Sequence, residues 1–135
     1  MNAAIVREWL EHVEADLDAA WSCGRGPRAR LDRAAYLLQQ AAEKLVKAVL
    51  VSASVDPPRT HDIAGLIAEL REDIPFRDRL SALSSLTPYA TGFRYPTPHE
   101  PPPLPSRDRL EAYIVEIETL KADFERWLAQ REAQP

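Results

Sequence analysis

The chain has 135 residues, the size of one domain, and its 45% hydrophobic content is enough to bury a single core. A formal net charge of -4 argues against a protein that binds nucleic acid regardless of sequence, because such binding depends on positive charges that neutralise phosphates. Any nucleic-acid role must therefore rest on a local basic patch. The single cysteine excludes an internal disulfide. The first residues do not have the pattern of a secretory leader, and no run of roughly 18 apolar residues occurs. We therefore expect a soluble, cytoplasmic protein that does not enter a membrane.

Apolar residues recur at helical spacing along most of the chain, and no stretch alternates as a half-buried strand does, so the fold is predicted to be all-α. A first helix is expected over residues 3–22. Its buried stripe is predicted to hold Ile5, Val6, Trp9, Val13, Leu17 and Ala20. A second, longer helix is expected to start at about Pro27, because proline suits a first helical turn, and to end at Ser54.

The second helix is predicted to bury one narrow face and to expose the opposite one. The buried face is expected to hold Ala34, Leu38, Ala41, Leu45, Ala48 and Val49. The exposed face is expected to carry Tyr36, Gln40, Glu43, Lys44 and Lys47. Because Glu43 and Lys47 lie four residues apart, we expect them to form an ion pair along the helix.

Two shorter helices and a long loop are expected next. Thr60 is predicted to cap a helix that ends at Arg71, and a further helix is expected from Pro75 to just before Pro88. The segment 87–105 holds more than half of the chain's prolines, which favour extended or turn structure. Long loops of this kind often carry function.

A last helix is predicted over residues 106–129, with Ser106 as its N-cap. Its buried stripe is expected to hold Leu110, Tyr113, Ile114, Ile117, Phe124, Trp127 and Leu128. Together these elements predict one domain over residues 1–135, an antiparallel up-down bundle of four to five helices.

A cluster of arginines surrounds the predicted start of the second helix. It consists of Arg25, Arg28, Arg30 and Arg33. Cations are unfavourable at a helix N-terminus by ~0.3–1 kcal/mol each, so the cluster suggests a bound anion such as phosphate. The alternative is a solvated arginine-rich segment whose charge is balanced by Asp32 and the acidic first helix.

Three segments carry a resemblance to a known family. They are "AAYLLQQAAEKLVKAVL" at 34–50, "THDI" at 60–63 and "RYP" at 94–96. In this order and spacing the chain resembles the HEPN family, small helical bundles found beside minimal nucleotidyltransferases. The resemblance implies a helical bundle that pairs as a homodimer and acts with a nucleotidyltransferase partner in a toxin-antitoxin-type module.

The resemblance also implies a metal-independent endoribonuclease with an arginine and a histidine separated by four to six residues. Arg94 and His99 fit this spacing and are the candidate catalytic residues. The histidine would move protons at the 2′-hydroxyl and the leaving oxygen, while the arginine would stabilise charge on the phosphorane. No metal or cofactor is expected.

The prolines between these two residues constrain their geometry. Pro96 and Pro98 exclude a helix, and a polyproline-like path would separate the Cα atoms of Arg94 and His99 by about 15 Å. The two side chains therefore converge only if the segment turns or if the partner chain of a dimer supplies one of them.

His61 is a second titratable candidate, at the start of the predicted third helix. It either contacts a nucleotide or phosphate, together with the four arginines and Tyr95, or merely satisfies N–H groups at the helix end. The rival function is a non-catalytic bundle that binds a nucleotide or a partner protein. A third possibility is a purely structural bundle whose tryptophans, Trp9, Trp21 and Trp127, pack against another chain.

Overall fold

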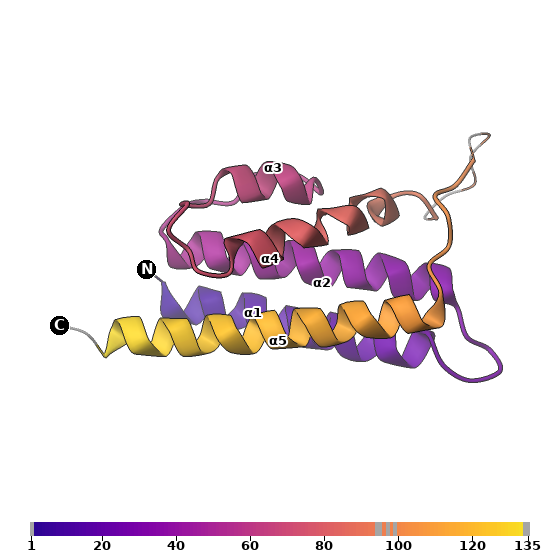
Figure 1. Cartoon of the computed structure of the whole chain (residues 1–135), viewed down its shortest axis with the longest axis horizontal. Helices are drawn as coiled ribbons and strands as arrows, with labels where there is room; N and C mark the ends of the chain where they lie inside the picture. Colours follow the sequence, from indigo (N-terminus) through magenta and orange to yellow (C-terminus); the bar gives the residue numbers. More distant parts are fainter. Residues whose placement is uncertain (1, 94–95, 97, 99, 134–135) are drawn as a thin grey trace.

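The computed structural model describes residues 2–93, 96, 98 and 100–133. Its helices are α1 (Ala3–Cys23), α2 (Leu31–Ser52), α3 (Ile63–Ala68), α4 (Arg77–Ala82), the 3₁₀ helix η1 (Leu83–Ala90) and α5 (Arg107–Glu132). The described residues include no strand, and the helices run up and down beside one another (Figure 1). The predicted all-α, antiparallel up-down bundle is confirmed.

Helix α2 is the centre of the bundle and contacts α1, α3, η1 and α5. Its alanines, among them Ala35, Ala41 and Ala48, are fully buried and let the neighbouring helices approach closely. The prediction of a single narrow buried face was therefore too simple. Gln39 and Glu43 are also buried, although Glu43 was expected on an exposed face.

The buried stripe of α1 follows regular helical spacing. It consists of Val6, Leu10, Val13, Leu17 and Ala20. The prediction for Ile5 was wrong, since this side chain is 43% exposed, and Leu10 takes a core position that was not predicted. Ile5 and Trp9 lie on the flank of the stripe, because residues one position before Val6 and Leu10 are turned by about 100° from them.

The second helix starts at Leu31 rather than at Pro27. Gly26 has a φ of +79°, the left-handed region that glycine adopts most readily, and the chain reverses direction around it. The Arg30 N–H donates to the Cys23 carbonyl at 2.6 Å, which closes this turn. The arginines before Leu31 thus lie in a connecting turn, and the expected conflict with the helix dipole applies only to Arg33.

The short helices also differ from prediction at their ends. Thr60 is not the N-cap of α3; that position is Asp62, and the Thr60 hydroxyl accepts a hydrogen bond from the Asp62 N–H at 3.1 Å. Helix α4 starts at Arg77, and η1 continues past Pro88 to Ala90. Proline has a fixed φ that suits a 3₁₀ turn, so it removes one hydrogen bond without ending the helical path.

Helix α5 begins as predicted. The Ser106 hydroxyl accepts a hydrogen bond from the Arg109 N–H at 3.1 Å, which confirms Ser106 as the N-cap. The helix then runs to Glu132, three residues beyond the predicted end. Its buried residues are Leu110, Ile114, Ile117, Leu120 and Phe124. None of the helices within the described residues has the length and apolar content needed to cross a membrane.

The proline-rich segment folds back onto the end of η1. A Cβ atom at Gly92 would lie 2.6 Å from side-chain atoms of Pro102, so only glycine allows this approach. The Tyr89 hydroxyl donates to the Pro103 carbonyl at 3.1 Å. The described residues on the two sides of the segment are therefore held together at one place.

Candidate functional site

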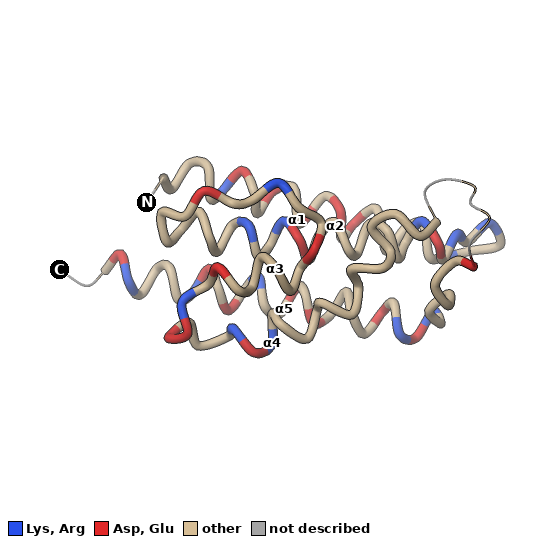
Figure 2. The backbone as a smooth tube through the Cα atoms, turned by 90° about the horizontal axis from the view of Figure 1, so that it is seen from above, with Lys and Arg blue, Asp and Glu red and all other residues tan. Residues whose placement is uncertain are grey.

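One end of the bundle gathers exposed positive charge. Figure 2 shows several Lys and Arg positions, with Asp and Glu positions among them, where α1 connects to α2 and where α5 begins. We call this surface the arginine end; its residues, all exposed, are Arg25, Arg28, Arg30, Arg33, Arg107 and Arg109. A chain with a net charge of -4 thus carries a local basic patch of the kind that phosphate binding requires.

Contacts between the turn and α5 hold the arginine end together. Arg25 Nη2 lies 3.1 Å from Glu111 Oε1, and the Arg25 guanidinium lies 3.2 Å from the centroid of the Trp21 ring. Trp21, Arg25, Arg107 and Glu111 line one small depression with a volume of about 10 Å³. The predicted arginine cluster of the first turn therefore shares its surface with the start of α5, which the sequence pattern did not reveal.

The proline-rich segment leaves η1 and returns to α5 beside an aromatic pair. The rings of Tyr89 and Phe93 stack with centroids 5.7 Å apart. Burial raises the pKa of Tyr89, and neighbouring Tyr113 raises it further, so the hydroxyl stays protonated and able to donate to Pro103. The candidate residues Arg94, Tyr95 and His99 lie outside the described residues.

A second cluster of polar side chains is centred on Glu43 in α2. Its Oε1 atom accepts hydrogen bonds from His61 Nδ1 at 2.8 Å and from Gln39 Nε2 at 3.2 Å. Its Oε2 atom accepts one from Lys47 Nζ at 3.0 Å, which confirms the predicted pair. The Glu43 side chain is only 5% exposed, so these donors replace the water that a carboxylate otherwise needs.

Burial alone would raise the pKa of Glu43, because the charged form loses its water. The hydrogen bonds from His61, Lys47 and Gln39, with the positive charge of Lys47, outweigh burial and lower the pKa below its ordinary value. Glu43 is therefore a carboxylate at neutral pH. A carboxylate has no hydrogen to donate, so the Nδ1 atom of His61 must carry it.

This cluster gives His61 a partner that the sequence did not predict, the Glu43 carboxylate. The ring is tied to Glu43, while Gln39 also donates to the His61 backbone carbonyl at 3.3 Å. The imidazole is half-exposed and fixed through Nδ1, which leaves Nε2 to act toward solvent as an acid, a base or a phosphate contact. Sequence spacing could not reveal the pair, because His61 follows a loop rather than sharing a helix with Glu43.

The two groups of candidate residues occupy different parts of the bundle. Glu43 lies ten residues after Arg33 in α2, which is about 15 Å along the helix axis. The structure therefore separates His61 from the arginines with which it was grouped. Among the described residues, no group of three or more His, Cys, Asp and Glu side chains is placed to hold a metal ion.

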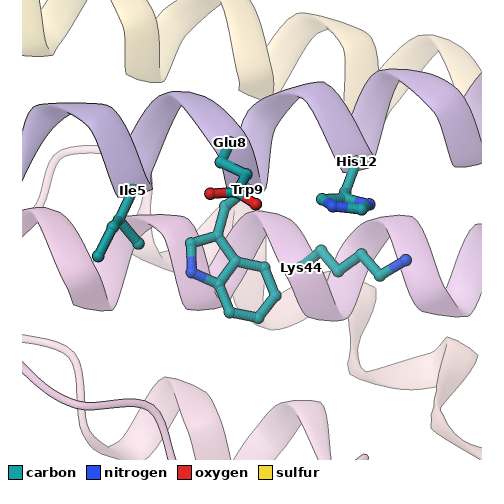
Figure 3. Close-up of a pocket in the computed structure, with 5 residues that line it drawn as sticks. All are labelled: Ile5, Glu8, Trp9, His12 and Lys44. Carbon is teal, nitrogen blue, oxygen red and sulfur yellow. The ribbon is translucent and has the colours of Figure 1, made fainter.

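A third feature is a depression of about 400 Å³ over α1 and α2 (Figure 3). Ile5, Trp9 and His12 line it from α1, and Lys44 lines it from α2. The Lys44 ammonium lies 2.7 Å from a carboxylate oxygen of Asp16, so its charge is already neutralised. The depression therefore lacks the concentrated charge of the arginine end.

Comparison with known proteins gives the family. The HEPN domain profile matches residues 6–127, which include most of α1, the whole of α2, α3, α4 and η1, and most of α5. The chain belongs to the HEPN family. The resemblance inferred from the three sequence segments is thus confirmed, and both the arginine end and the Glu43 cluster lie within the HEPN match.

This HEPN chain is also similar to a solved structure, the crystal structure of TT1696 from Thermus thermophilus. The TM-score is 0.70 at 27% sequence identity, and the similarity covers 93% of this chain and 98% of TT1696. No curated protein matches the chain significantly. The comparisons therefore establish the HEPN bundle over nearly its whole length.

Proposed function

We propose that this HEPN protein is a metal-independent endoribonuclease that acts with a nucleotidyltransferase partner in a toxin-antitoxin-type module in the cytoplasm. Arg94 and His99 are its proposed catalytic residues. The observation that carries the proposal is the closure of the proline-rich segment, whose described flanks meet at Gly92 and Pro102.

This closure supports the proposed catalytic pair on geometric grounds. A polyproline-like path would hold Arg94 and His99 about 15 Å apart at their Cα atoms. Nine residues separate Gly92 from Pro102, and these two residues are in contact, so the chain between them has to reverse direction. A reversal favours the approach of an arginine and a histidine within one loop.

The arginine end supports binding of an RNA substrate beside this loop. The segment ends at Pro105, and Arg107 follows within the first turn of α5. Exposed arginines from the turn between α1 and α2 lie at the same end of the bundle (Figure 2). Guanidinium groups bind phosphate oxygens through paired hydrogen bonds, so the backbone of an RNA strand can be held next to the proposed site.

The proposed reaction uses the 2′-hydroxyl of the RNA as nucleophile. His99 removes the proton from this hydroxyl, the oxygen attacks the adjacent phosphorus, and Arg94 stabilises the negative charge of the phosphorane. The bond to the 5′-oxygen of the next nucleotide then breaks, and this oxygen takes up a proton from the protonated His99 imidazole. The products are a 2′,3′-cyclic phosphate and a 5′-hydroxyl end.

Cleavage of single-stranded RNA in the presence of EDTA tests this function. We expect the parent chain to give 2′,3′-cyclic phosphate ends, and Arg94→Ala to reduce the rate at least about 100-fold, the lower range for a lost electrostatic contact. Arg59→Ala is the matched control, since Arg59 is exposed and, like Arg94, stands near prolines in the sequence. Equal rates for Arg94→Ala and Arg59→Ala would sink the proposed site.

The alternative is a non-catalytic bundle that binds a nucleotide or the partner protein. The arginine end favours it independently, because its phosphate contacts need no catalytic pair. RNA or nucleotide binding by a parent chain that leaves RNA intact would support this alternative. We further propose that two copies pair as a homodimer and that the nucleotidyltransferase co-purifies with them; light scattering and co-expression test these two associations.

A further inference from the structure

Trp21 is an aromatic side chain that the proposed reaction does not use. It lies in the last turns of α1 and is 45% exposed. The flat guanidinium of Arg25 covers its ring at 3.2 Å from the centroid. A stack of one indole and one guanidinium therefore stands at the surface of the arginine end.

Another arginine–tryptophan pair, also within the described residues, has a different setting. Arg131 lies 4.5 Å over the ring of Trp127, but that ring packs edge-on against Phe76 and close to Phe124 in the core. Trp127 is thus explained by packing. Trp21 keeps nearly half of its surface in water, so packing into the core does not account for its ring.

The stack is held in place before any ligand arrives. Glu111 in α5 pairs with Arg25 Nη2 at 3.1 Å, so the guanidinium edge is fixed by the carboxylate while its plane lies on the indole. Arg107 lines the same small depression. That depression, about 10 Å³, is too small to enclose a ligand, so a partner would lie flat on the surface.

We propose that Trp21 and Arg25 form a stacking platform for an unpaired base of single-stranded RNA, whose neighbouring phosphates are neutralised by Arg28 and Arg107. Aromatic rings and arginine planes both stack on nucleobases, and every base offers a face, so the platform selects unpaired strands rather than a sequence. The proposal rests on the proposed function only for the identity of the nucleic acid.

RNA binding by a cleavage-defective chain tests the platform. In a His99→Ala background, the affinity for a fluorescein-labelled single-stranded RNA of about 12 nucleotides is measured by anisotropy, a length within the range bound by single-strand proteins. Trp21→Ala is expected to weaken binding about tenfold, which equals about 1.4 kcal/mol. Trp21→Phe, which keeps a ring, is expected to restore most of the affinity.

Arg131→Ala serves as the matched control, because it also removes an arginine that covers a tryptophan. Its affinity is expected to stay within about twofold of the background chain. A direct readout uses a chain with Trp9→Phe and Trp127→Phe, in which Trp21 is the remaining tryptophan. Single-stranded RNA is expected to quench its fluorescence more strongly than duplex RNA of the same sequence.

Two results would overturn the platform. The first is an equal RNA affinity of the background chain and its Trp21→Ala variant. The second is a background chain that binds no RNA but co-purifies with a protein that the Trp21→Ala variant loses. That result would make this surface a protein interface. A parent chain that binds RNA through Trp21 but does not cleave it would contradict the ribonuclease and support the platform. The two proposals therefore fail separately.

Discussion

At the scale of single residues, Glu43 is the side chain whose environment departs most from its sequence context. A glutamate four residues before a lysine usually marks a solvated helix surface, yet here the carboxylate is buried and accepts from three side chains. The cluster links the middle of α2 to the chain just before α3. Its stability role can be measured independently of any activity.

Replacing Glu43 by alanine is expected to lower the free energy of unfolding by about 3–5 kcal/mol, because Lys47 would keep a partly buried, uncompensated charge. Urea denaturation followed by circular dichroism measures the change. Glu11→Ala, at an exposed position of α1, is the matched control and should change stability by less than about 0.5 kcal/mol. A loss as small as that of the control would show that the cluster is not stabilising.

The contribution of Glu43 should also depend on pH. Its pKa is lower in the folded chain than the ordinary value of 4.5, so its stabilisation is fully present above pH 4.5 and is lost as the pH falls through the folded pKa. We therefore expect the stability difference between the parent and Glu43→Gln to be constant near neutral pH and to shrink below about pH 4.5. A difference that grows on acidification would contradict the assignment.

At the scale of elements, helical spacing located each long helix but not the ends of the shorter ones. Ser106 was predictable because its capping bond is local, to the N–H three residues ahead. The start of α2 could not be predicted in this way, because it depends on a turn at Gly26 that the antiparallel packing of α1 and α2 requires. Helical spacing could not predict the contact of Gly92 with Pro102, because these residues are far apart in the sequence. It could not predict the burial of Glu43 either, because the partner His61 comes from another part of the chain.

Gly92→Ala tests the closure of the proline-rich segment. The added methyl would meet Pro102 atoms at 2.6 Å and the Pro88 carbonyl oxygen at 2.7 Å, so we expect a loss of about 1–3 kcal/mol in the free energy of unfolding. In Gly65→Ala the new methyl meets a flexible Asp62 side chain at 3.0 Å, and stability should be nearly unchanged. Thermal unfolding compares the two, and equal stability would speak against the closure.

At the scale of the whole molecule, charge is distributed unevenly along the bundle. The chain is acidic overall, whereas the arginine end is basic and lies opposite the chain termini (Figures 1 and 2). Composition predicted that any nucleic-acid contact would need a local patch, and the fold brings Arg107 and Arg109 to the predicted cluster. The catalytic pair itself stays a prediction, since Arg94 and His99 lie outside the described residues.

The salt dependence of RNA binding tests whether local charge or total charge matters. Removing Arg28 and Arg30 together should reduce the slope of log affinity against log salt by about 1.4, at roughly 0.7 per phosphate contact. The double variant Arg126→Ala/Arg131→Ala removes the same charge from the far end of α5 and should leave the slope unchanged. Equal slopes for the two double variants would mean that the arginine end is not the RNA surface.

The most direct test of the ribonuclease is the rate of RNA cleavage in EDTA by the parent, His99→Ala and His12→Ala chains. His12, exposed on α1, controls for the loss of a histidine. We predict that His99→Ala reduces the rate by about 100-fold or more, as expected for a lost general acid–base group, while His12→Ala cleaves at the parent rate. Undiminished cleavage by His99→Ala, or no cleavage by the parent, would contradict the account.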